Sequence, residues 1–169
     1  MTPLSPEQWR VLNYLHHHKM HTLRPSLLHL RKLQYVGDAD LIDLEDRGLI
    51  TAILGNDEIQ RAGLAALMNT TLVARLRLRL SRPGLHTVLD DPGNQIRFTL
   101  GAYRTPIRLS TLFVGNTIVI DDVITMQRRR LIAVELLDFG EFELTPDARR
   151  CTEIFIVRLT DKGAEYLPR

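Results

Sequence analysis

The chain has 169 residues, 44% of them hydrophobic and 25% charged, which is the composition of a globular protein with one domain or two small ones. It has no run of ~18 apolar residues that could span a membrane. Its amino terminus lacks the pattern of a signal peptide, and its single cysteine excludes an internal disulfide. These features predict a cytoplasmic location, where thiols stay reduced.

The charge is nearly balanced, with 22 basic and 20 acidic side chains, so it does not by itself indicate a nucleic-acid partner. Arginine dominates the basic residues, because only Lys19, Lys32 and Lys162 are lysines. Arginine is suited to paired hydrogen bonds with phosphate and guanine, but a GC-rich genome produces the same bias. The composition leaves both explanations open.

Residues 1–69 show the pattern of several helices around one short hairpin. Ser5 is a suitable N-cap, Pro6 a suitable first helical residue, and Gly48 a suitable residue to close a helix in the left-handed conformation. In chain order, the spacing of apolar and turn residues predicts a helix over 6–18, a helix from Thr22 or Arg24–Pro25 to the turn at Gly37, a helix over 38–47, a strand over 49–54, a turn at 55–56 and a helix over 59–68.

Residues 70–169 begin with a period of two. The alternation in Leu72–Leu80, LVARLRLRL, predicts a half-buried strand with Leu76 and Leu78 facing inward. The further expected elements are strands over 85–89 and 95–100 around a turn at 90–94, a short strand or helix approach at 117–120, a helix from Asp121 or Asp122 to 138, strands over 139–144 and 151–159, and a final helix capped by Thr160 or Asp161. We therefore expect an α+β fold with an amino-terminal domain over 1–69 and a β-richer second domain over 70–169.

Two segments resemble winged helix-turn-helix regulators of the MarR and PadR type. Leu44–Thr51, LEDRGLIT, is similar to the end of the third helix in that family, and Leu159–Leu167, LTDKGAEYL, is similar to the helix after the wing. In the family these motifs flank one hairpin, whereas here more than a hundred residues separate them. Either a large domain interrupts one wing or the unit occurs twice. We favour repetition, because Ile59–Leu67 already resembles the helix after the wing and Leu136–Phe142, LLDFGEF, echoes Leu44–Ile50.

The resemblance implies a DNA-reading surface in a second winged-helix-like unit. If Leu136–Phe142 ends a third helix, the basic run before it lies at the amino-terminal end of that helix, where base contacts are made. Two arginines between the last two strands would contact phosphate from the wing, and two basic residues of the first unit could touch the DNA backbone. The candidate DNA-binding residues are Gln127, Arg128, Arg129, Arg130, Arg149, Arg150, Arg31 and Lys32. The alternative interpretation of the run is an ordinary exposed basic segment.

Two other charged segments have alternative interpretations. The segment Asp38–Asp46 is strongly acidic and would repel phosphate, so it is either a solvated helix face or a surface for a basic protein partner. Arg75, Arg77 and Arg79, with Arg82, could follow a nucleic-acid backbone, pair with acids of a second subunit, or solubilise the outer face of a sheet.

Signs of catalysis or metal binding are weak. His17 and His21, among the histidines at 16, 17, 18, 21 and 29, are one helical turn apart, but no cysteine or carboxylate pair accompanies them. Cys151 has no histidine motif beside it, and the sequence lacks the phosphate-loop, HExxH and GxSxG motifs. We therefore expect no enzymatic activity, no cofactor and no bound metal.

These observations predict a DNA-binding transcriptional regulator that acts as a homodimer on double-stranded DNA. The alternative is a non-catalytic protein-interaction module on a winged-helix scaffold, such as an anti-repressor or accessory factor, which the acidic Asp38–Asp46 face favours.

Overall fold

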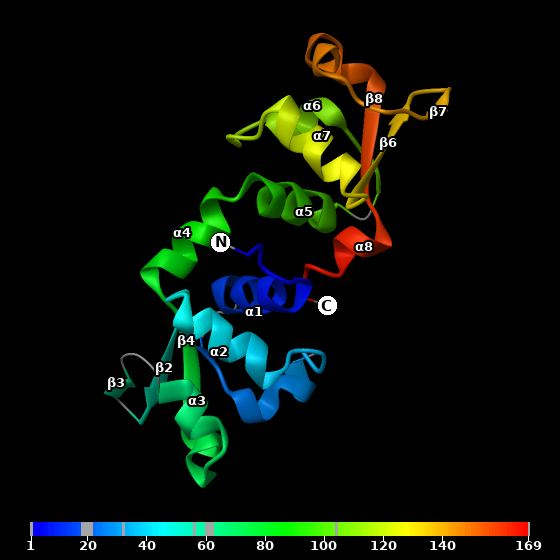
Figure 1. Cartoon of the computed structure of the whole chain (residues 1–169). Helices are drawn as coiled ribbons and strands as arrows, with labels where there is room; N and C mark the ends of the chain where they lie inside the picture. The colour runs from blue at the N-terminus through cyan, green and yellow to red at the C-terminus, as the bar shows by residue number, and fades with distance from the viewer. Residues whose placement is uncertain are drawn as a thin grey trace. The chain divides into compact units, whose positions relative to one another are not determined.

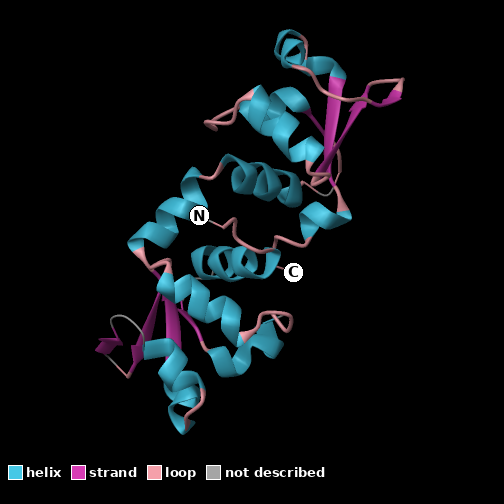
Figure 2. Cartoon of the chain, in the orientation of Figure 1, coloured by secondary structure: helices cyan, strands magenta, loops and turns pink. Residues whose placement is uncertain are grey.

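The computed structural model describes residues 2–17, 22–31, 33–55, 57–59, 63–103 and 105–168, with the side chains of 29–31 and 57–59 outside the description. The fold is α+β, as predicted (Figure 2). The chain divides into two compact units: Met1–Leu89 with Pro168–Arg169, and Asp90–Leu167 (Figure 1).

The first unit contains a four-stranded antiparallel sheet in the order β1-β4-β2-β3. Its elements are α1 (Pro6–His17), β1 (Thr22–Leu23), the 3-10 helix η1 (Pro25–Arg31), α2 (Asp38–Asp46), β2 (Ile50–Leu54), β3 (Asp57–Ile59), α3 (Gly63–Met68), η2 (Thr71–Arg75), β4 (Leu76–Leu80) and α4 (Arg82–Asp90). Apolar residues at helical spacing on α1 and α2 and at alternate positions on β4 form the core, and Leu12, Leu41 and Leu78 are all fully buried.

The second unit contains a four-stranded antiparallel sheet in the order β5-β8-β6-β7. Its elements are α5 (Pro92–Ala102), β5 (Ile107–Arg108), α6 (Leu109–Phe113), α7 (Ile120–Arg128), β6 (Ile132–Leu136), β7 (Gly140–Glu141), η3 (Pro146–Arg150), η4 (Thr152–Ile154), β8 (Phe155–Leu159) and α8 (Asp161–Ala164). Ile96, Val123 and Val157 are among its fully buried core residues.

The two units repeat one order of elements: a helix, a two-residue strand, a short helical segment, a second full helix, a hairpin, and a last strand followed by a helix. The repetition extends to one close backbone contact. A Cβ on Gly84 would lie 2.0 Å from the carbonyl oxygen of Leu49, and a Cβ on Gly163 would lie 2.0 Å from the carbonyl oxygen of Leu131. The two units therefore share an order of elements and a strand order.

The repeat has a different register from the expected one. Gly48 ends α2 with φ of 70°, and the equivalent residue after α7 is Arg130, with φ of 60°. The amide of Leu49 bonds to Leu44 and that of Leu131 to Met126, so both helices end with the same backbone reversal. The expected helix up to residue 138 is therefore wrong after Arg128. Leu136–Phe142 is not a helix end, because residues 132–136 and 140–141 form a hairpin.

Two segments that were expected to be strands are helices in the structure. Residues 85–89 belong to α4 and residues 95–100 belong to α5. The side chain of Asp91 caps α5 by accepting a hydrogen bond from the Asn94 amide at 2.5 Å, and Pro92 follows it at the start of the helix. The turn-forming residues at 90–94 therefore begin a helix.

The expected domain boundary after residue 69 differs from the observed one at Leu89. The reason is β4, which pairs with β2 over five positions and so belongs to the first unit. Several other expected elements are shorter than their predicted ranges: α3 within 59–68, β4 within 72–80, β7 within 139–144 and β8 within 151–159. The helices expected near 6–18 and 38–47, the strand near 49–54 and the final helix capped by Thr160 are confirmed.

Candidate binding surfaces

Gln127 lies in the last turn of α7, and both ends of its side-chain amide bond to the backbone of its own unit. Its Nε2 donates a hydrogen bond to the carbonyl of Phe142 at 2.6 Å, and its Oε1 accepts one from the amide of Leu144 at 2.9 Å. These bonds hold the segment that leaves the β6–β7 hairpin. The expected role of Gln127 in reading adenine does not fit this geometry, because both ends of its amide are already bonded.

Arg128, Arg129 and Arg130 are exposed, but they lie at the carboxyl-terminal end of α7 and in the turn after it. The carbonyl of Arg129 accepts a hydrogen bond from Lys162 at 3.1 Å, and that of Arg130 accepts one from Thr160 at 2.8 Å. The expectation that these arginines stand at the amino-terminal end of a helix is therefore wrong. Cations at this end of a helix are favoured by the helix dipole.

The amino-terminal turn of α7 carries acids in place of the expected arginines. Asp121 is exposed, and Asp122 accepts a hydrogen bond from the Val119 amide at 2.9 Å, which caps the helix. The first turn of α2 has the same arrangement, since Asp40 accepts a hydrogen bond from the Gly37 amide at 3.0 Å. Both helices therefore present carboxylates at the end that would have to approach phosphate.

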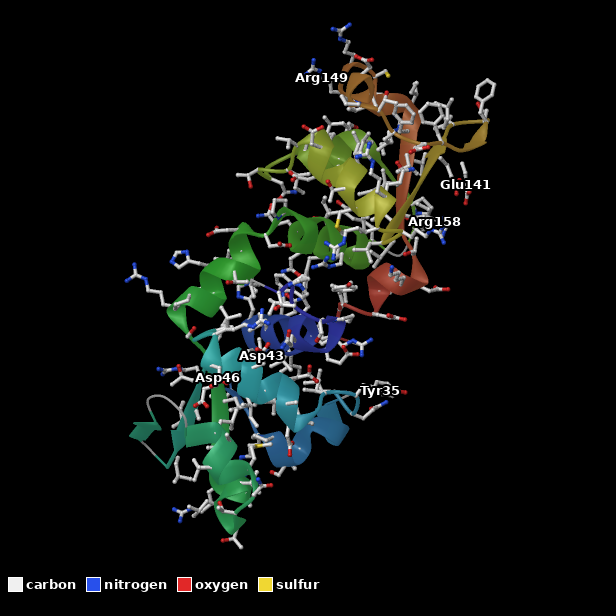
Figure 3. All side chains as sticks on the ribbon, viewed as in Figure 1. Tyr35, Asp43, Asp46, Glu141, Arg149 and Arg158 are labelled. Carbon is white, nitrogen blue, oxygen red and sulfur yellow. The ribbon has the colours of Figure 1, made fainter. Side chains whose placement is uncertain are left out.

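Arg149 and Arg150 are exposed in η3 and are separated from the arginines after α7. Arg150 precedes the start of β8, whereas Arg130 bonds to Thr160, which follows its end. The length of β8 is roughly 13 Å at ~3.3 Å per residue. Figure 3 shows Arg149 beyond one end of β8 and Arg158 near the other. The structure therefore does not bring Arg149 and Arg150 together with Arg129 and Arg130.

The remaining candidate DNA contacts are in the first unit. Arg31 is the last residue of η1, with its side chain outside the description, and Lys32 lies outside the described residues. Of the basic strand residues, Arg77 donates a hydrogen bond to the carbonyl of Gly55 at 2.6 Å, and Arg79 is exposed and pairs opposite Thr51.

The acids of α2 have several different roles. Asp38 and Asp46 are exposed, whereas Asp43 bonds to Arg47 at 2.8 Å. That bond lowers the pKa of Asp43. Glu45 is buried and accepts a hydrogen bond from the Leu64 amide at 3.0 Å, and its pKa is raised by burial. The exposed acidic surface is therefore smaller than the sequence suggests (Figure 3).

The histidines and the cysteine singled out in the sequence lie in different settings. His16 and His17 lie edge to face, with ring centroids 4.6 Å apart, and the pKa of His17 is lowered by burial and by the charge of His16. The other histidine of the proposed pair, His21, lies outside the described residues. Within the part of the chain that the structure describes, no three His, Cys, Asp or Glu side chains are placed to hold a metal ion. Cys151 is an exposed free thiol.

The sequence analysis missed an apolar surface at the tip of the β6–β7 hairpin. We define the hairpin-tip patch as Leu137, Phe139 and Ile154, which are 41%, 82% and 46% exposed. The amide of Leu137, just after β6, donates to the carbonyl of Ile154, just before β8, at 2.9 Å, so these two residues are neighbours. Asp138 and Gly140, with φ of 69° and 83°, allow the hairpin to turn within three residues and leave Phe139 at its tip.

Acidic side chains adjoin the hairpin-tip patch. Asp138, Glu141 and Glu143 are exposed, and Glu141 projects from β7 (Figure 3). Two other acids of this region are already matched: Glu135 bonds to Arg158 at 3.3 Å and Glu153 to Arg108 at 3.2 Å. Among the described residues, the three hairpin acids have no such ion pair.

A groove of about 400 Å³ continues from the hairpin toward the end of α7. Glu141, Phe142 and Glu143 line its hairpin end, and Arg130 and Thr160 line its other end, with Ala133 of β6 between them. The ring of Phe142 lies 5.2 Å from that of Phe155, which fixes the hairpin against β8. The sequence feature that could have indicated this surface is the run Phe139–Glu143, FGEFE, in which aromatic and acidic residues alternate around a glycine.

The comparisons with known proteins add no functional assignment. No protein-family model matches the chain, and neither the curated proteins nor the solved structures contain a significant match. In the described part of the chain, none of the helices combines the length and apolarity needed to cross a membrane.

Proposed function

We propose that this protein is a non-catalytic protein-interaction module built from two winged-helix-like units. The order of elements supports the scaffold: in each unit a helix, a short strand and two further helical segments precede a hairpin, and the first and last strands pair. In this interpretation α2 and α7 are the third helices, and the β6–β7 hairpin is the wing of the second unit. The hairpin-tip patch is the single observation that carries the function.

Three features disfavour DNA reading by the second unit. The amino-terminal turn of α7 carries Asp121 and Asp122, the wing carries Asp138, Glu141 and Glu143, and Gln127 is bonded within its own unit. Carboxylates at the helix end and on the wing would both repel phosphate. The DNA-binding regulator and its homodimer, expected from the sequence, remain the competing prediction.

The hairpin-tip patch favours a protein partner. Phe139 is 82% exposed at the tip of a hairpin, and Leu137 and Ile154, which bond to each other through their backbones, are 41% and 46% exposed. Grouped exposed apolar side chains with polar neighbours are typical of protein-protein contact sites. Aromatic residues contribute large contact areas to such sites.

The first experiment tests DNA binding directly. A labelled random-sequence duplex is titrated with the full chain by fluorescence anisotropy between ~50 and ~200 mM salt, where a phosphate-binding protein loses affinity steeply. We expect no saturable binding tighter than about 10⁻⁴ M at the lower salt concentration. Saturable binding that falls steeply with salt and is lost in an R128A/R129A/R130A variant would support the DNA-binding prediction and overturn this proposal.

The second experiment tests the hairpin as a contact site. The photo-crosslinking amino acid p-benzoylphenylalanine replaces Phe139, or Tyr35 as a control that is 68% exposed in the first unit, in the full chain expressed in its native cells. We expect a protein adduct of defined mass from position 139 and none of that mass from position 35. Absence of a discrete adduct from position 139 would contradict the proposal.

A further inference from the structure

The groove beside the hairpin constrains the chemistry of the partner, and the following inference rests on the proposed function. We infer that the partner supplies an extended segment in which a lysine or arginine side chain enters the groove between Glu141 and Glu143, while its apolar neighbours cover the hairpin-tip patch.

The first argument is unbalanced charge next to apolar surface. In the second unit, Arg158 bonds to Glu135 at 3.3 Å, and Arg108 bonds to Glu153 at 3.2 Å. The acids of the hairpin have no cation of their own among the described residues. A partner that covers the patch also covers these carboxylates, and leaving them unpaired would cost binding free energy. A basic residue beside the apolar contact removes that cost.

The second argument is the direction of the groove. Glu141 and Glu143 line its hairpin end, and Arg130 lines the end next to α7. Because both residues line the groove, the two carboxylates can face one cation. Arg130 repels a second cation at the far end. The basic residue of the partner therefore lies toward the hairpin, close to the apolar residues that contact Phe139.

The third argument is rigidity. The segment that carries Glu143 is held on both sides, because Gln127 bonds to the carbonyl of Phe142 at 2.6 Å and to the amide of Leu144 at 2.9 Å. The amide of Phe142 also donates to Val134 at 2.9 Å. The hairpin end of the groove is thus largely formed before binding, which lowers the ordering cost of association.

The test compares two variants with the same change in charge, each carrying p-benzoylphenylalanine at position 139. E141Q/E143Q removes the two groove acids, and D161N/E165Q removes two exposed acids in and after α8, which do not line the groove. Adduct yield is measured in native cells and, once the adduct identifies the partner, affinity is measured with the purified full chains. We expect the E141Q/E143Q affinity to fall about five- to thirty-fold at low salt, and the control to stay within about two-fold.

Each outcome separates this inference from the proposed function. Loss of the adduct in E141Q/E143Q but not in the control supports the inference. An equal adduct yield in the unsubstituted protein and in both variants overturns the inference and leaves the proposed function standing. An equal loss of adduct in both variants has the same consequence, because it reports net charge alone. Absence of an adduct in every protein refutes the proposed function and the inference together.

The crosslinked peptide provides an independent measurement. Mass spectrometry should place a lysine or arginine within a few residues of the crosslinked position in the partner. A crosslinked segment that is acidic, or that comes from a second copy of this chain, would overturn the inference.

Discussion

Replacing Gly163 by alanine tests the close backbone contact that both units share. A Cβ at this position would lie 2.0 Å from the carbonyl oxygen of Leu131, 3.0 Å from its carbonyl carbon and 2.8 Å from Cδ1 of Leu159. Carbon and oxygen atoms in contact are normally more than 3 Å apart, so backbone has to shift by about 1 Å. The Leu131 carbonyl also accepts a hydrogen bond from the Thr160 amide at 3.1 Å, which that shift would weaken.

We estimate the cost from these two effects. Overpacking against backbone costs about 1–3 kcal/mol, and weakening one hydrogen bond costs about 1 kcal/mol. G163A should therefore destabilise the protein by about 2–4 kcal/mol. The sign is informative, because alanine stabilises an unobstructed helical position by about 1 kcal/mol relative to glycine.

The assay is urea unfolding followed by far-ultraviolet circular dichroism. G84A should show a loss of similar size, because a Cβ there would also lie 2.0 Å from a backbone oxygen, that of Leu49. Trp9 is the only tryptophan and is buried in α1, so its fluorescence reports the G84A change in the first unit. In the control G37A, the nearest atom to the new Cβ is 3.7 Å away, so stability should fall only by the difference between glycine and alanine at an N-cap, about 1 kcal/mol or less. If G163A and G84A are as stable as the wild type or more stable, the described close approach is wrong.

The remaining predictions concern single polar side chains. Q127L should destabilise the second unit by about 1–3 kcal/mol and speed hydrogen exchange of the Leu144 amide, because it removes two side-chain bonds; unchanged exchange would refute the tether. D91A should cost about 1–3 kcal/mol in urea unfolding, because this side chain caps α5 and its carboxylate lies 3.9 Å from buried Arg97, whose pKa burial lowers to about 10; unchanged stability would contradict the cap. Because burial raises the pKa of Glu45, its proton binds more tightly in the folded state, so acidification through that raised pKa favours folding. The stability of E45Q relative to the wild type should therefore fall between pH 7 and pH ~4, and a constant difference would contradict this assignment.

The candidate site was only partly accessible from the sequence. The sequence identified Gln127 and the three arginines after it but placed them at the wrong end of a helix, because the prediction treated Gly140 as the residue that ends it. The structure ends α7 at Arg128 and uses Arg130 in the left-handed conformation, which few residues other than glycine adopt. That conformation costs free energy in a residue with a Cβ, so an arginine in the sequence does not indicate that a helix ends beside it. Residues 129–138 were therefore assigned to a helix, and the hairpin-tip patch went unnoticed.

Local patterns alone determined the elements whose caps and apolar spacing agree. Residues 6–17 form a helix after Ser5, α2 ends before Gly48, and Leu76 and Leu78 of β4 are fully buried, because these signals act within a few residues. Only the tertiary structure decided that 95–100 is a helix, since its apolar residues fit either period and packing chose between them. The tertiary structure also assigned β4 to the first unit, because strand pairing joins residues that are far apart in the sequence.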